Sequence, residues 1–264
     1  MAGSARIGID IGGTFTDVAL ERGAERFTIK TLTTHAAPEE GVIEGLARVL
    51  DEADVAPGEV TLVIHGTTLA TNALIERKGA RTALVTTEGF RDVLEIRHED
   101  RYEQYDLTIA LPEPLVPRRL RLPVPERVDA AGLIRRPLDV AAVERVAERL
   151  AAEAVEAVAV GFLHSWAMPA HEERAGEILA RRLPGVAITL SCEVAPQMRE
   201  YERFSTAAAN AYVQPLMAGY LDRLERRLAQ AGLSCPLLLM LSGGGLATVE
   251  TARRFPVRLV ESGP

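Results

Sequence analysis

Two acidic residues bracket a pair of glycines near the N-terminus, in the segment Asp10-Ile11-Gly12-Gly13-Thr14-Phe15-Thr16-Asp17. Glycines at a tight turn let backbone N–H groups converge on an anionic oxygen, because no Cβ stands in the way. The threonine hydroxyls add further donors. Asp10 is suited to hold Mg²⁺ through waters or to accept a proton from a nucleophile. A plain β-hairpin is the alternative, but two acids around Gly-Gly-Thr-x-Thr favour a phosphate site.

A second candidate cluster, His65-Gly66-Thr67-Thr68, follows an apolar run. It comes at the expected carboxyl end of a strand and opens a helix, and in an open α/β sheet this crevice is the usual ligand site. A helix N-terminus capped by Thr67 and Thr68 favours an anion. Helix capping alone, with a histidine satisfied internally, is the alternative. Asn72, on the following helix, is a weaker candidate.

Other polar groups are interpreted as structural. The run Arg199–Arg203 alternates in charge, as solvent-exposed helix starts do. His164 and Ser165 are adjacent on a predicted strand, so they point to opposite faces and are assigned to packing. His171 has no second histidine at metal-ligand spacing and is placed on a helix surface. The chain contains neither Gly-x4-Gly-Lys-Ser/Thr nor Gly-x-Gly-x-x-Gly, which weighs against P-loop and Rossmann folds.

The composition limits the class of protein. The 264 residues are 47% hydrophobic and 25% charged, with a net charge of −7, which is typical of a globular chain of about two domains. An acidic chain lacks the cationic surface that binds nucleic acid or anionic membranes. Cys192 and Cys235 are far apart, so we expect no disulfide framework or zinc site and assign both to the core. No apolar run reaches the ~18 residues of a membrane span and no secretory signal is recognisable, so a cytoplasmic protein is expected.

The elements that must position these residues follow an α/β pattern. Alternation predicts strands at 6–11 and 16–20 around the glycine turn and a third at 26–30. Apolar periodicity predicts further strands at 60–65, 81–86, 157–163, 186–191 and 236–241 and helices from 38 and at 72–77, 138–152, 169–182 and 201–230. Pro215 should break or kink the last helix. Six prolines between residues 99 and 137 indicate an irregular, partly β insertion.

These segments resemble a known family. The glycine motif is similar to the first phosphate loop of the acetate-kinase, sugar-kinase, Hsp70 and actin superfamily. More narrowly, residues 7–264 look like the N-terminal part of the hydantoinase A/5-oxoprolinase family, which includes acetone carboxylase β-subunit relatives. Besides the glycine motif, the likeness is carried by His65–Thr68, Thr71–Leu74, Leu84–Asp92, Tyr105–Leu107, Leu163–Trp166, Arg199–Arg203, Asn210–Tyr212 and Ser262–Pro264. The family often has Ser-Asn-Gly-Gly where this chain has Ser242-Gly243-Gly244-Gly245.

The resemblance implies an actin/Hsp70/sugar-kinase-like (ribonuclease H-like) ATPase fold of two α/β lobes that close on Mg-ATP. It implies a first lobe at 1–195, with the proline-rich insertion at about 99–137, and a connecting helix with the truncated start of a second lobe at 196–264. Asp10 would hold Mg²⁺ or move a proton, and Asp17 would support the loop or approach the substrate. The implied phosphate contacts are Gly12, Gly13, Thr14, Thr16, Gly243, Gly244 and Gly245, and the implied substrate cleft contains His65, Thr67, Thr68 and Asn72.

The activity implied by the resemblance is ATP-dependent opening of a cyclic amide of the hydantoin or 5-oxoproline type, together with a hydantoinase B-type partner subunit or domain. Phosphorylating the oxygen of an unactivated amide creates a good leaving group and invites attack by water, so catalysis of the phosphoryl step is mostly positioning and charge neutralisation. Because most of the implied second lobe is missing, the chain alone is expected to hydrolyse little ATP.

Three alternatives stay open on the sequence. The first is a carboxylase subunit that phosphorylates a ketone enol or bicarbonate, as in the acetone carboxylase relatives. The second is a non-catalytic nucleotide-binding or assembly subunit, although the presence of Asp10 together with the glycine turn argues against it. A sugar or acetate kinase is the third.

Overall fold

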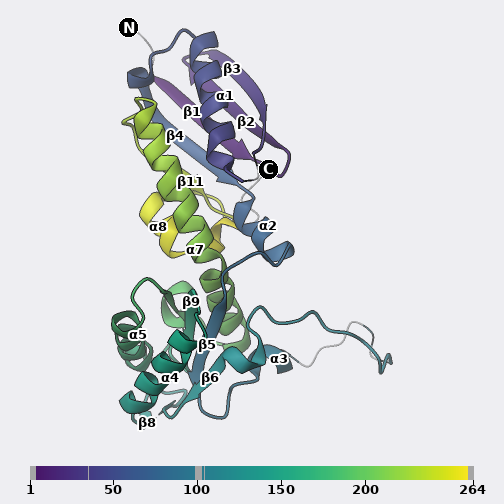
Figure 1. Cartoon of the computed structure of the whole chain (residues 1–264), viewed down its shortest axis with the longest axis vertical. Coiled ribbons are helices and arrows are strands. Elements are labelled where there is room, and N and C mark those ends of the chain that lie inside the picture. The colour runs from purple at the N-terminus through teal and green to yellow at the C-terminus, as the bar shows by residue number, and fades with distance from the viewer. Residues whose placement is uncertain (1–3, 35, 99–102, 104, 261–264) are drawn as a thin grey trace. The chain divides into compact units, whose positions relative to one another are not determined.

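The computed structural model describes residues 4–34, 36–98, 103 and 105–260. The chain forms two compact units, which we call unit 1 (residues 1–78 and 216–264) and unit 2 (residues 79–215) (Figure 1). Both units combine a β-sheet with helices, so the expected α/β class is confirmed. The division into lobes at 1–195 and 196–264, which the resemblance implies, stays a prediction. The segment Ser262–Pro264 lies outside the described residues.

Unit 1 is built on a six-stranded sheet with the order β12-β11-β4-β1-β2-β3. The first three strands form an antiparallel meander, whereas β4 and β11 run parallel to β1. The bounds are β1 Ala5–Ile11, β2 Phe15–Arg22, β3 Glu25–Leu32, β4 Val60–Thr67, β11 Leu237–Met240 and β12 Leu246–Thr248. The predicted meander with its glycine turn is therefore confirmed.

Two helices cover one face of the unit 1 sheet. They are α1 (Pro38–Glu52) and the later part of α7 (Glu200–Gln230), and Figure 1 shows both on the same side of the strands. Arg223 of α7 donates through Nε to Glu39 of α1 at 2.6 Å, which joins the two helices. The covered face carries every second residue of β1, as expected for a strand with one buried face.

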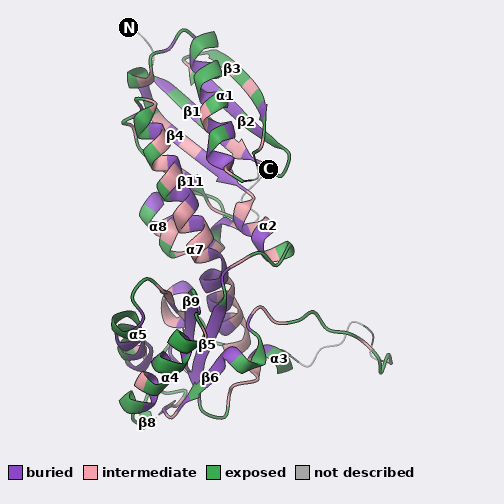
Figure 2. Cartoon of the chain, in the orientation of Figure 1, coloured by how far each residue is buried: buried purple, intermediate pink, exposed green. Residues whose placement is uncertain are grey.

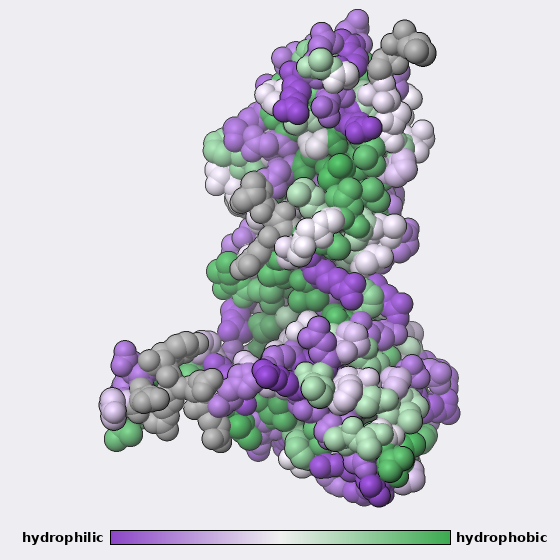
Figure 3. Space-filling view, turned by 180° about the vertical axis from the view of Figure 1, so that it is seen from behind, coloured by the Kyte–Doolittle hydropathy of each residue, from purple (hydrophilic) through white to green (hydrophobic). Residues whose placement is uncertain are grey.

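The other face of the unit 1 sheet is more open. Alternate residues of β1 and β2 lie on it, among them the exposed Gly8, Asp17 and Ala19. Seen from behind, unit 1 shows a band of hydrophobic residues between hydrophilic ones (Figure 3). The residues that the sequence associates with phosphate chemistry stand at one end of β1 and β2.

Unit 2 is built on a four-stranded parallel sheet with the order β10-β9-β5-β6. The strands are β5 Thr82–Thr87, β6 Arg121–Val124, β9 Ala157–Gly161 and β10 Ala187–Leu190, and the long helices before α7 are α4 Val140–Ala152 and α5 Ala170–Arg182. Every residue of β5 and β9 is buried, as Figure 2 shows in purple. Parallel strands enclosed on both faces are typical of α/β units.

Short elements complete the two units. They are α2 Leu69–Ile75, α3 Val93–Ile96, β7 Arg127–Val128, β8 Ile134–Arg136, α6 Ser191–Val194, α8 Val249–Arg254 and the 3-10 turns at Pro57–Glu59, Arg118–Leu120 and Pro256–Leu259. None of the helices in the described ranges has the length and apolar character needed to cross a lipid bilayer.

Two local expectations need correction. Pro215, which was expected to break or kink the last helix, does not break α7, which runs without interruption from Glu200 to Gln230; a kink at this residue stays a prediction. Its flanking residues Val213 and Met217 are fully buried, so packing on both sides of the proline holds the helix together. The strand expected at 157–163 ends at Gly161, because the next residues turn away from the sheet.

Candidate functional site

The turn between β1 and β2 presents backbone amides to solvent. Gly12 N donates to Phe15 O at 2.9 Å, and Thr33 N donates to Thr14 O at 2.9 Å. Within the described ranges, no hydrogen bond engages the amides of Gly13 and Thr14, and both residues are exposed. Free amides at a glycine turn are the groups that hold phosphate oxygens in proteins. The turn can therefore hold an anion.

Thr16 lies inside this turn instead of facing a ligand. Its side chain is fully buried, and its Oγ1 lies 3.0 Å from Thr33 Oγ1. The Thr33 hydroxyl in turn donates to Gly12 O at 3.0 Å. Strand alternation is the cause, because Thr16 points to the opposite face from Phe15 and Asp17. The structure thus corrects the expected phosphate contact of Thr16, which fixes the turn from within.

Asp10 and Asp17 are register partners on β1 and β2. Asp17 is exposed and pairs with Lys30, whose Nζ lies 2.9 Å from Asp17 Oδ1. Asp10 is half-buried, and its Oδ1 has no hydrogen-bond partner among the residues that the structure describes. Burial, and next the charge of Asp17, raise the pKa of Asp10, while Lys30 acts in the opposite direction. A cation, a water or a proton would stabilise this unsatisfied oxygen.

A cavity of about 370 Å³ adjoins this acidic pair. Asp10, Asp17 and Lys30 line part of it, and Gly8 and Ile64 are among the residues of the remainder. The volume is in the range of small-molecule sites, which combine an apolar lining with a few polar groups. The cavity lies wholly within unit 1, beside the glycine turn.

His65 is enclosed, so the structure corrects its expected place in a substrate cleft. Its ring is completely buried; Nδ1 lies 3.4 Å from Ile9 O, and Nε2 lies 2.8 Å from the hydroxyl of Tyr220. Burial lowers the pKa of His65 to about 4, and the hydrogen bond to Ile9 opposes that shift. The neutral ring joins β4 to β1 and to α7, and this internal role is the alternative that the sequence left open.

The threonines that follow His65 and the side chain of Asn72 lie beside the glycine turn. The hydroxyl of Thr68 donates to Ile11 O at 3.1 Å, and Asn72 Nδ2 lies 3.4 Å from that hydroxyl. A Cβ built on Gly13 would stand 3.9 Å from Asn72 Nδ2. Thr67 is buried, and its Oγ1 accepts from Leu69 N at 3.2 Å, so its hydroxyl satisfies the amide of the first residue of α2. Of this cluster, Thr68 and Asn72 are the groups nearest to the turn.

The second glycine cluster, Gly243-Gly244-Gly245, forms the exposed turn between β11 and β12. Gly244 and Gly245 have φ of 83° and 87°, a left-handed conformation that favours glycine. Ser242 is drawn away from the turn, because its hydroxyl donates to Arg258 O at 2.7 Å. A contact between these glycines and a phosphate stays a prediction.

The donor set around Asp10 fits a hydrated Mg²⁺ only in part. In residues 4–34, 36–98, 103 and 105–260, no group of three or more His, Cys, Asp or Glu side chains could hold a metal ion. Mg²⁺ commonly binds through one or two carboxylates, waters and the phosphates of a nucleotide, without a full protein cage. The carboxylate of Asp10, whose Oδ1 has no partner among the described residues, is a ligand of the type that such an ion binds.

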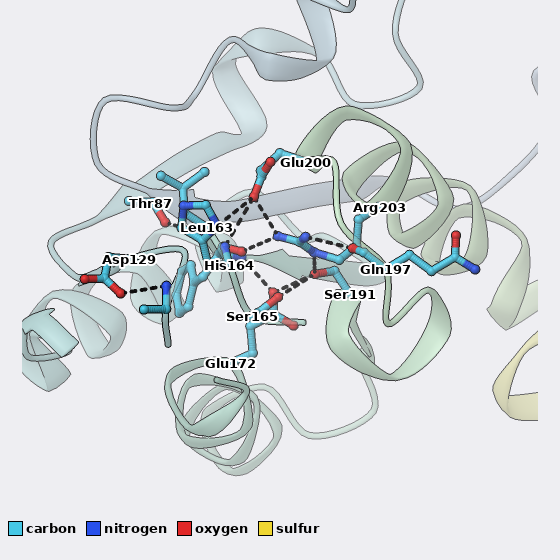
Figure 4. A network of polar contacts seen from close by, with 12 residues as sticks. Thr87, Asp129, Leu163, His164, Ser165, Glu172, Ser191, Gln197, Glu200 and Arg203 are labelled. Atoms are coloured by element: carbon cyan, nitrogen blue, oxygen red, sulfur yellow. Dashed lines mark hydrogen bonds and ion pairs between the residues drawn. The ribbon is translucent and has the colours of Figure 1, made fainter. Parts of the chain in front are cut away.

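Unit 2 encloses a charged network that the sequence placed on its surface (Figure 4). Arg203 is buried, and it donates through Nη2 to Phe162 O at 2.6 Å and through Nε to Ser191 Oγ at 3.0 Å. Glu172, also buried, accepts from Phe162 N at 2.7 Å and from Ser191 Oγ at 2.6 Å. The run Arg199–Arg203 is therefore only partly solvent-exposed, because its last residue anchors α7 to Phe162, which follows β9, and to Ser191.

The structure resolves three further assignments. His171 is buried and pairs with Glu126 at 2.8 Å, so its placement on a helix surface was wrong. His164 and Ser165 lie in a turn after β9 and not on a strand, and the buried Ser165 contacts Ser191 at 3.3 Å, which confirms a packing role. The two cysteines are free thiols of intermediate exposure, which corrects their assignment to the core.

Comparison with known proteins identifies the family of this chain. The model of the hydantoinase/oxoprolinase N-terminal region matches residues 6–183, and the hydantoinase/oxoprolinase model matches residues 203–264. The chain belongs to the hydantoinase/oxoprolinase family. The glycine turn and the cluster at His65 both fall within the first match, as the resemblance of the sequence predicted.

Two relatives and one solved structure show how the family varies. The chain is 37% identical to caprolactamase subunit alpha of Pseudomonas jessenii, over 98% of this chain and 38% of the relative. It is 31% identical to the acetophenone carboxylase gamma subunit of Aromatoleum aromaticum, over 92% of this chain and 36% of that subunit. The crystal structure of the ATP-dependent caprolactamase from P. jessenii superposes with a TM-score of 0.90 at 36% identity, over 98% of this chain and 38% of that one. The chain thus spans well under half the length of these relatives.

Sequence reasoning missed several residues of this hydantoinase/oxoprolinase chain. Lys30 pairs with Asp17, but the sequence around Lys30 contains no motif that indicates this, and only its position on the third strand of the meander could have suggested it. Tyr220 stands 155 residues from its partner His65, and nothing local in the sequence links the two. Glu172 had a detectable signal, since a carboxylate at an otherwise apolar helix position indicates a buried acceptor.

Proposed function

We propose that the chain is the N-terminal, nucleotide-binding part of an ATP-dependent enzyme that opens a cyclic amide. The fold we infer is the actin/Hsp70/sugar-kinase-like (ribonuclease H-like) ATPase fold. The observation that carries the proposal is the pair of unengaged amides at Gly13 and Thr14, beside the unpartnered carboxylate oxygen of Asp10. The family, and the likeness to a caprolactamase described as ATP-dependent, support the same conclusion.

The turn would bind the phosphates of ATP. The exposed amides of Gly13 and Thr14, with the Thr14 hydroxyl, offer donors for phosphate oxygens. Glycine at position 12 avoids a close contact, because a Cβ there would lie 3.3 Å from Phe15 O. Asn72 stands next to Gly13 and can add an amide donor. In the complete protein, we expect Gly243–Gly245 to form the second phosphate contact.

Asp10 would bind Mg²⁺ through a water and take part in proton transfer. Its free oxygen suits a water of Mg²⁺, which would neutralise phosphate charge during transfer. The raised pKa of Asp10 brings its proton affinity closer to neutral pH, as a general acid–base group requires. Asp17, which pairs with Lys30, lies across from Asp10, and its charge contributes to the raised pKa of Asp10.

The reaction we propose overcomes the low reactivity of an amide. Transfer of the terminal phosphoryl group of ATP to the amide oxygen would release ADP and make the carbonyl carbon electrophilic enough for water to attack. Collapse of the tetrahedral adduct would break the ring C–N bond, with the nitrogen protonated to an amine, and leave an acyl phosphate that a second water hydrolyses to the carboxylate and inorganic phosphate. The chain contributes positioning and charge neutralisation, which dominate phosphoryl transfer. A hydantoinase B-type partner subunit or domain would complete the enzyme.

The first prediction tests the turn. Gly13→Ala should weaken binding of Mg-ATP about tenfold or more, since a methyl group would stand over the phosphate amides and tenfold is about 1.4 kcal/mol. The fold should persist, because Gly13 is not in a left-handed conformation and the nearest atom to the new Cβ is 3.9 Å away. Isothermal titration calorimetry with Mg-ATP measures the effect.

Gly58→Ala is the matched control, because a Cβ there meets nothing within 4 Å and Gly58 lies in a separate 3-10 turn of unit 1. Asp10→Asn should reduce the Mg²⁺-dependent part of the affinity. Equal ATP affinity in all three variants and the unmodified chain would remove the turn from the mechanism.

A carboxylase-type reaction is the second candidate, favoured by the likeness to the acetophenone carboxylase subunit. The same nucleotide site would then phosphorylate a ketone enol or bicarbonate. A screen of lactams against ketones with bicarbonate, with ADP release as the readout, separates the two in the complete protein.

A further inference from the structure

Three threonine side chains gather on the inner side of the glycine turn. Thr16 of β2 and Thr31 of β3 are register partners, and Thr33 follows Thr31 by two positions, so the three side chains lie on one face of the strands. Thr16 and Thr31 are buried and Thr33 is half-buried. None of the phosphate contacts proposed above involves these hydroxyls. The hydroxyl of Thr33 instead contacts the turn itself.

Thr33 is joined to the turn by its backbone and by its side chain. Its N–H donates to Thr14 O at 2.9 Å, which extends the pairing of β2 with β3 by one residue beyond the end of the strands. Its Oγ1 donates to Gly12 O at 3.0 Å. Because a hydroxyl has one proton to donate, Thr16 is the donor in the 3.0 Å contact between the Oγ1 atoms of Thr16 and Thr33. Two hydrogen bonds in series therefore end on the carbonyl of Gly12.

The bond to Gly12 O decides where the next amide points. A trans peptide is planar, so its C=O and its N–H are directed to opposite sides. Because the carbonyl of Gly12 is held by Thr33, the N–H of Gly13 is directed away from Thr33, on the exposed side of the turn. Two successive glycines leave this peptide free to rotate, since neither has a Cβ that restricts its dihedral angles. The Thr33 hydroxyl supplies the restraint that the glycines lack.

We propose that Thr33 is a positioning residue of the phosphate site: acting through Gly12 O, its hydroxyl holds the Gly13 N–H in the direction of a bound phosphate oxygen. The inference rests on the proposed function and deepens it, since Thr33 does not touch the nucleotide. An amide that is aligned before binding avoids the ordering cost that a rotating peptide would add.

The motion of the Gly13 amide tests this role without nucleotide. Thr33→Val removes the hydroxyl but keeps the branched shape and the backbone N–H. We expect its Gly13 amide to show a lower order parameter if the peptide rotates fast, or exchange broadening if it rotates in microseconds to milliseconds, in NMR relaxation. Thr33→Ser, which keeps the hydroxyl, should behave as the unmodified chain does. Identical Gly13 relaxation in the unmodified chain and in Thr33→Val would overturn the proposal.

The affinity for Mg-ATP tests the consequence for binding. The apparent affinity falls with the fraction of molecules whose turn is competent to bind. From the usual net contribution of one hydrogen bond, we expect Thr33→Val to bind Mg-ATP about three- to tenfold more weakly than the unmodified chain in titration calorimetry. Thr33→Ser should bind with nearly the affinity of the unmodified chain. Full affinity in Thr33→Val would contradict the assignment.

Thr61→Val is the matched control. The hydroxyl of Thr61 donates to Ala5 O at 3.0 Å, at the end of β1 that lies away from the turn. The two valine variants should therefore lose similar free energies of unfolding in urea, while only Thr33→Val loses affinity for Mg-ATP. An equal loss of affinity in both would assign Thr33 to general stability and overturn the proposal. If Thr33→Val does not fold, Thr33→Ala removes the same hydroxyl and repeats the comparison.

The proposed function and this inference fail on different observations. Absence of Mg-ATP binding by the unmodified chain would overturn the proposed function, whereas the relaxation of the Gly13 amide still decides whether Thr33 orients that amide. Mg-ATP binding by the unmodified chain, together with unchanged Gly13 relaxation and affinity in Thr33→Val, would overturn only the role of Thr33.

Discussion

The imidazole of His65 is completely buried between β4, β1 and α7. Burial keeps the ring neutral and lowers its pKa to about 4, although the hydrogen bond to Ile9 O acts in the opposite direction. The same enclosure raises the pKa of Tyr220, mainly through burial and next through the charge of Glu39. Both groups therefore stay uncharged at neutral pH, and they serve to hold β4 against α7.

A pH-dependent stability follows from His65. Above pH ~6.5 the ring is neutral in both the folded and the unfolded chain. Below that pH the unfolded chain binds a proton that the folded chain takes up only near pH 4, so stability falls as pH falls, by up to about 3 kcal/mol across the window. Urea unfolding at pH 7, 6 and 5 measures the slope.

His65→Gln should flatten this slope relative to the unmodified chain, because glutamine does not titrate. The expectation concerns the slope and holds for any loss in the free energy of unfolding at pH 7. The other histidines contribute equally to both proteins. Parallel slopes would show that His65 does not set this part of the pH dependence.

At the scale of elements, close contact between α1 and the meander positions the glycine turn. A Cβ on Gly45 would stand 2.7 Å from Val18 Cγ2, and one on Gly41 would stand 3.0 Å from Leu32 O. These two glycines, one helical turn apart, let α1 approach β2 and β3 closely. The helix therefore constrains both strands that follow the turn.

Gly45→Ala should destabilise the chain by about 1–3 kcal/mol, the usual result of overpacking, although alanine by itself favours a helix by about 1 kcal/mol. Gly219→Ala in α7 is the control, since its new Cβ would meet only the flexible end of Arg223, at 3.4 Å. It should be neutral or stabilising. Urea unfolding free energies decide, and equal losses in the two variants would refute the close-packing argument.

At the scale of the whole chain, each unit has its own core. Unit 2 is continuous in sequence and contains all four strands of its sheet, whereas unit 1 is assembled from residues 1–78 and 216–264. Without residues 216–264 the sheet of unit 1 lacks β11 and β12, so β4 loses a neighbouring strand, and His65 of β4 also loses its contact with Tyr220 of α7. The two units should therefore differ in their ability to fold alone.

Residues 79–215 expressed alone should fold, with dispersed amide resonances and one cooperative urea transition, as small single domains do. Residues 1–78 alone should lack such a transition. Circular dichroism with urea titration tests both pieces. A disordered 79–215 piece would mean that unit 2 depends on contacts outside its own residues.

Much of the fold could be predicted because the relevant signals are local. The alternation in β1 and β2, the helix beginning at Pro38 and the stripe in α7 each depend on residues a few positions apart. The proline-rich insertion was only partly predictable: its β6 strand pairs in parallel with β5, a long-range pairing that composition does not reveal. The phosphate contact predicted for Thr16 was wrong because the motif alone does not show which residues of its strand alternate inward, and Thr16 is one of them.

The order of residues alone determined the glycine turn, its flanking acids and the family, because turn formation and motif recognition depend on neighbours in the chain. Tertiary structure decided which of those residues remain available. It buried His65 against Tyr220. It also buried Arg203 beside Ser191, which donates to Glu172, and it left Oδ1 of Asp10 without a hydrogen-bond partner among the described residues. The physical reason is that burial and pairing arise from segments far apart in sequence, whose contacts form only when sheets and helices pack.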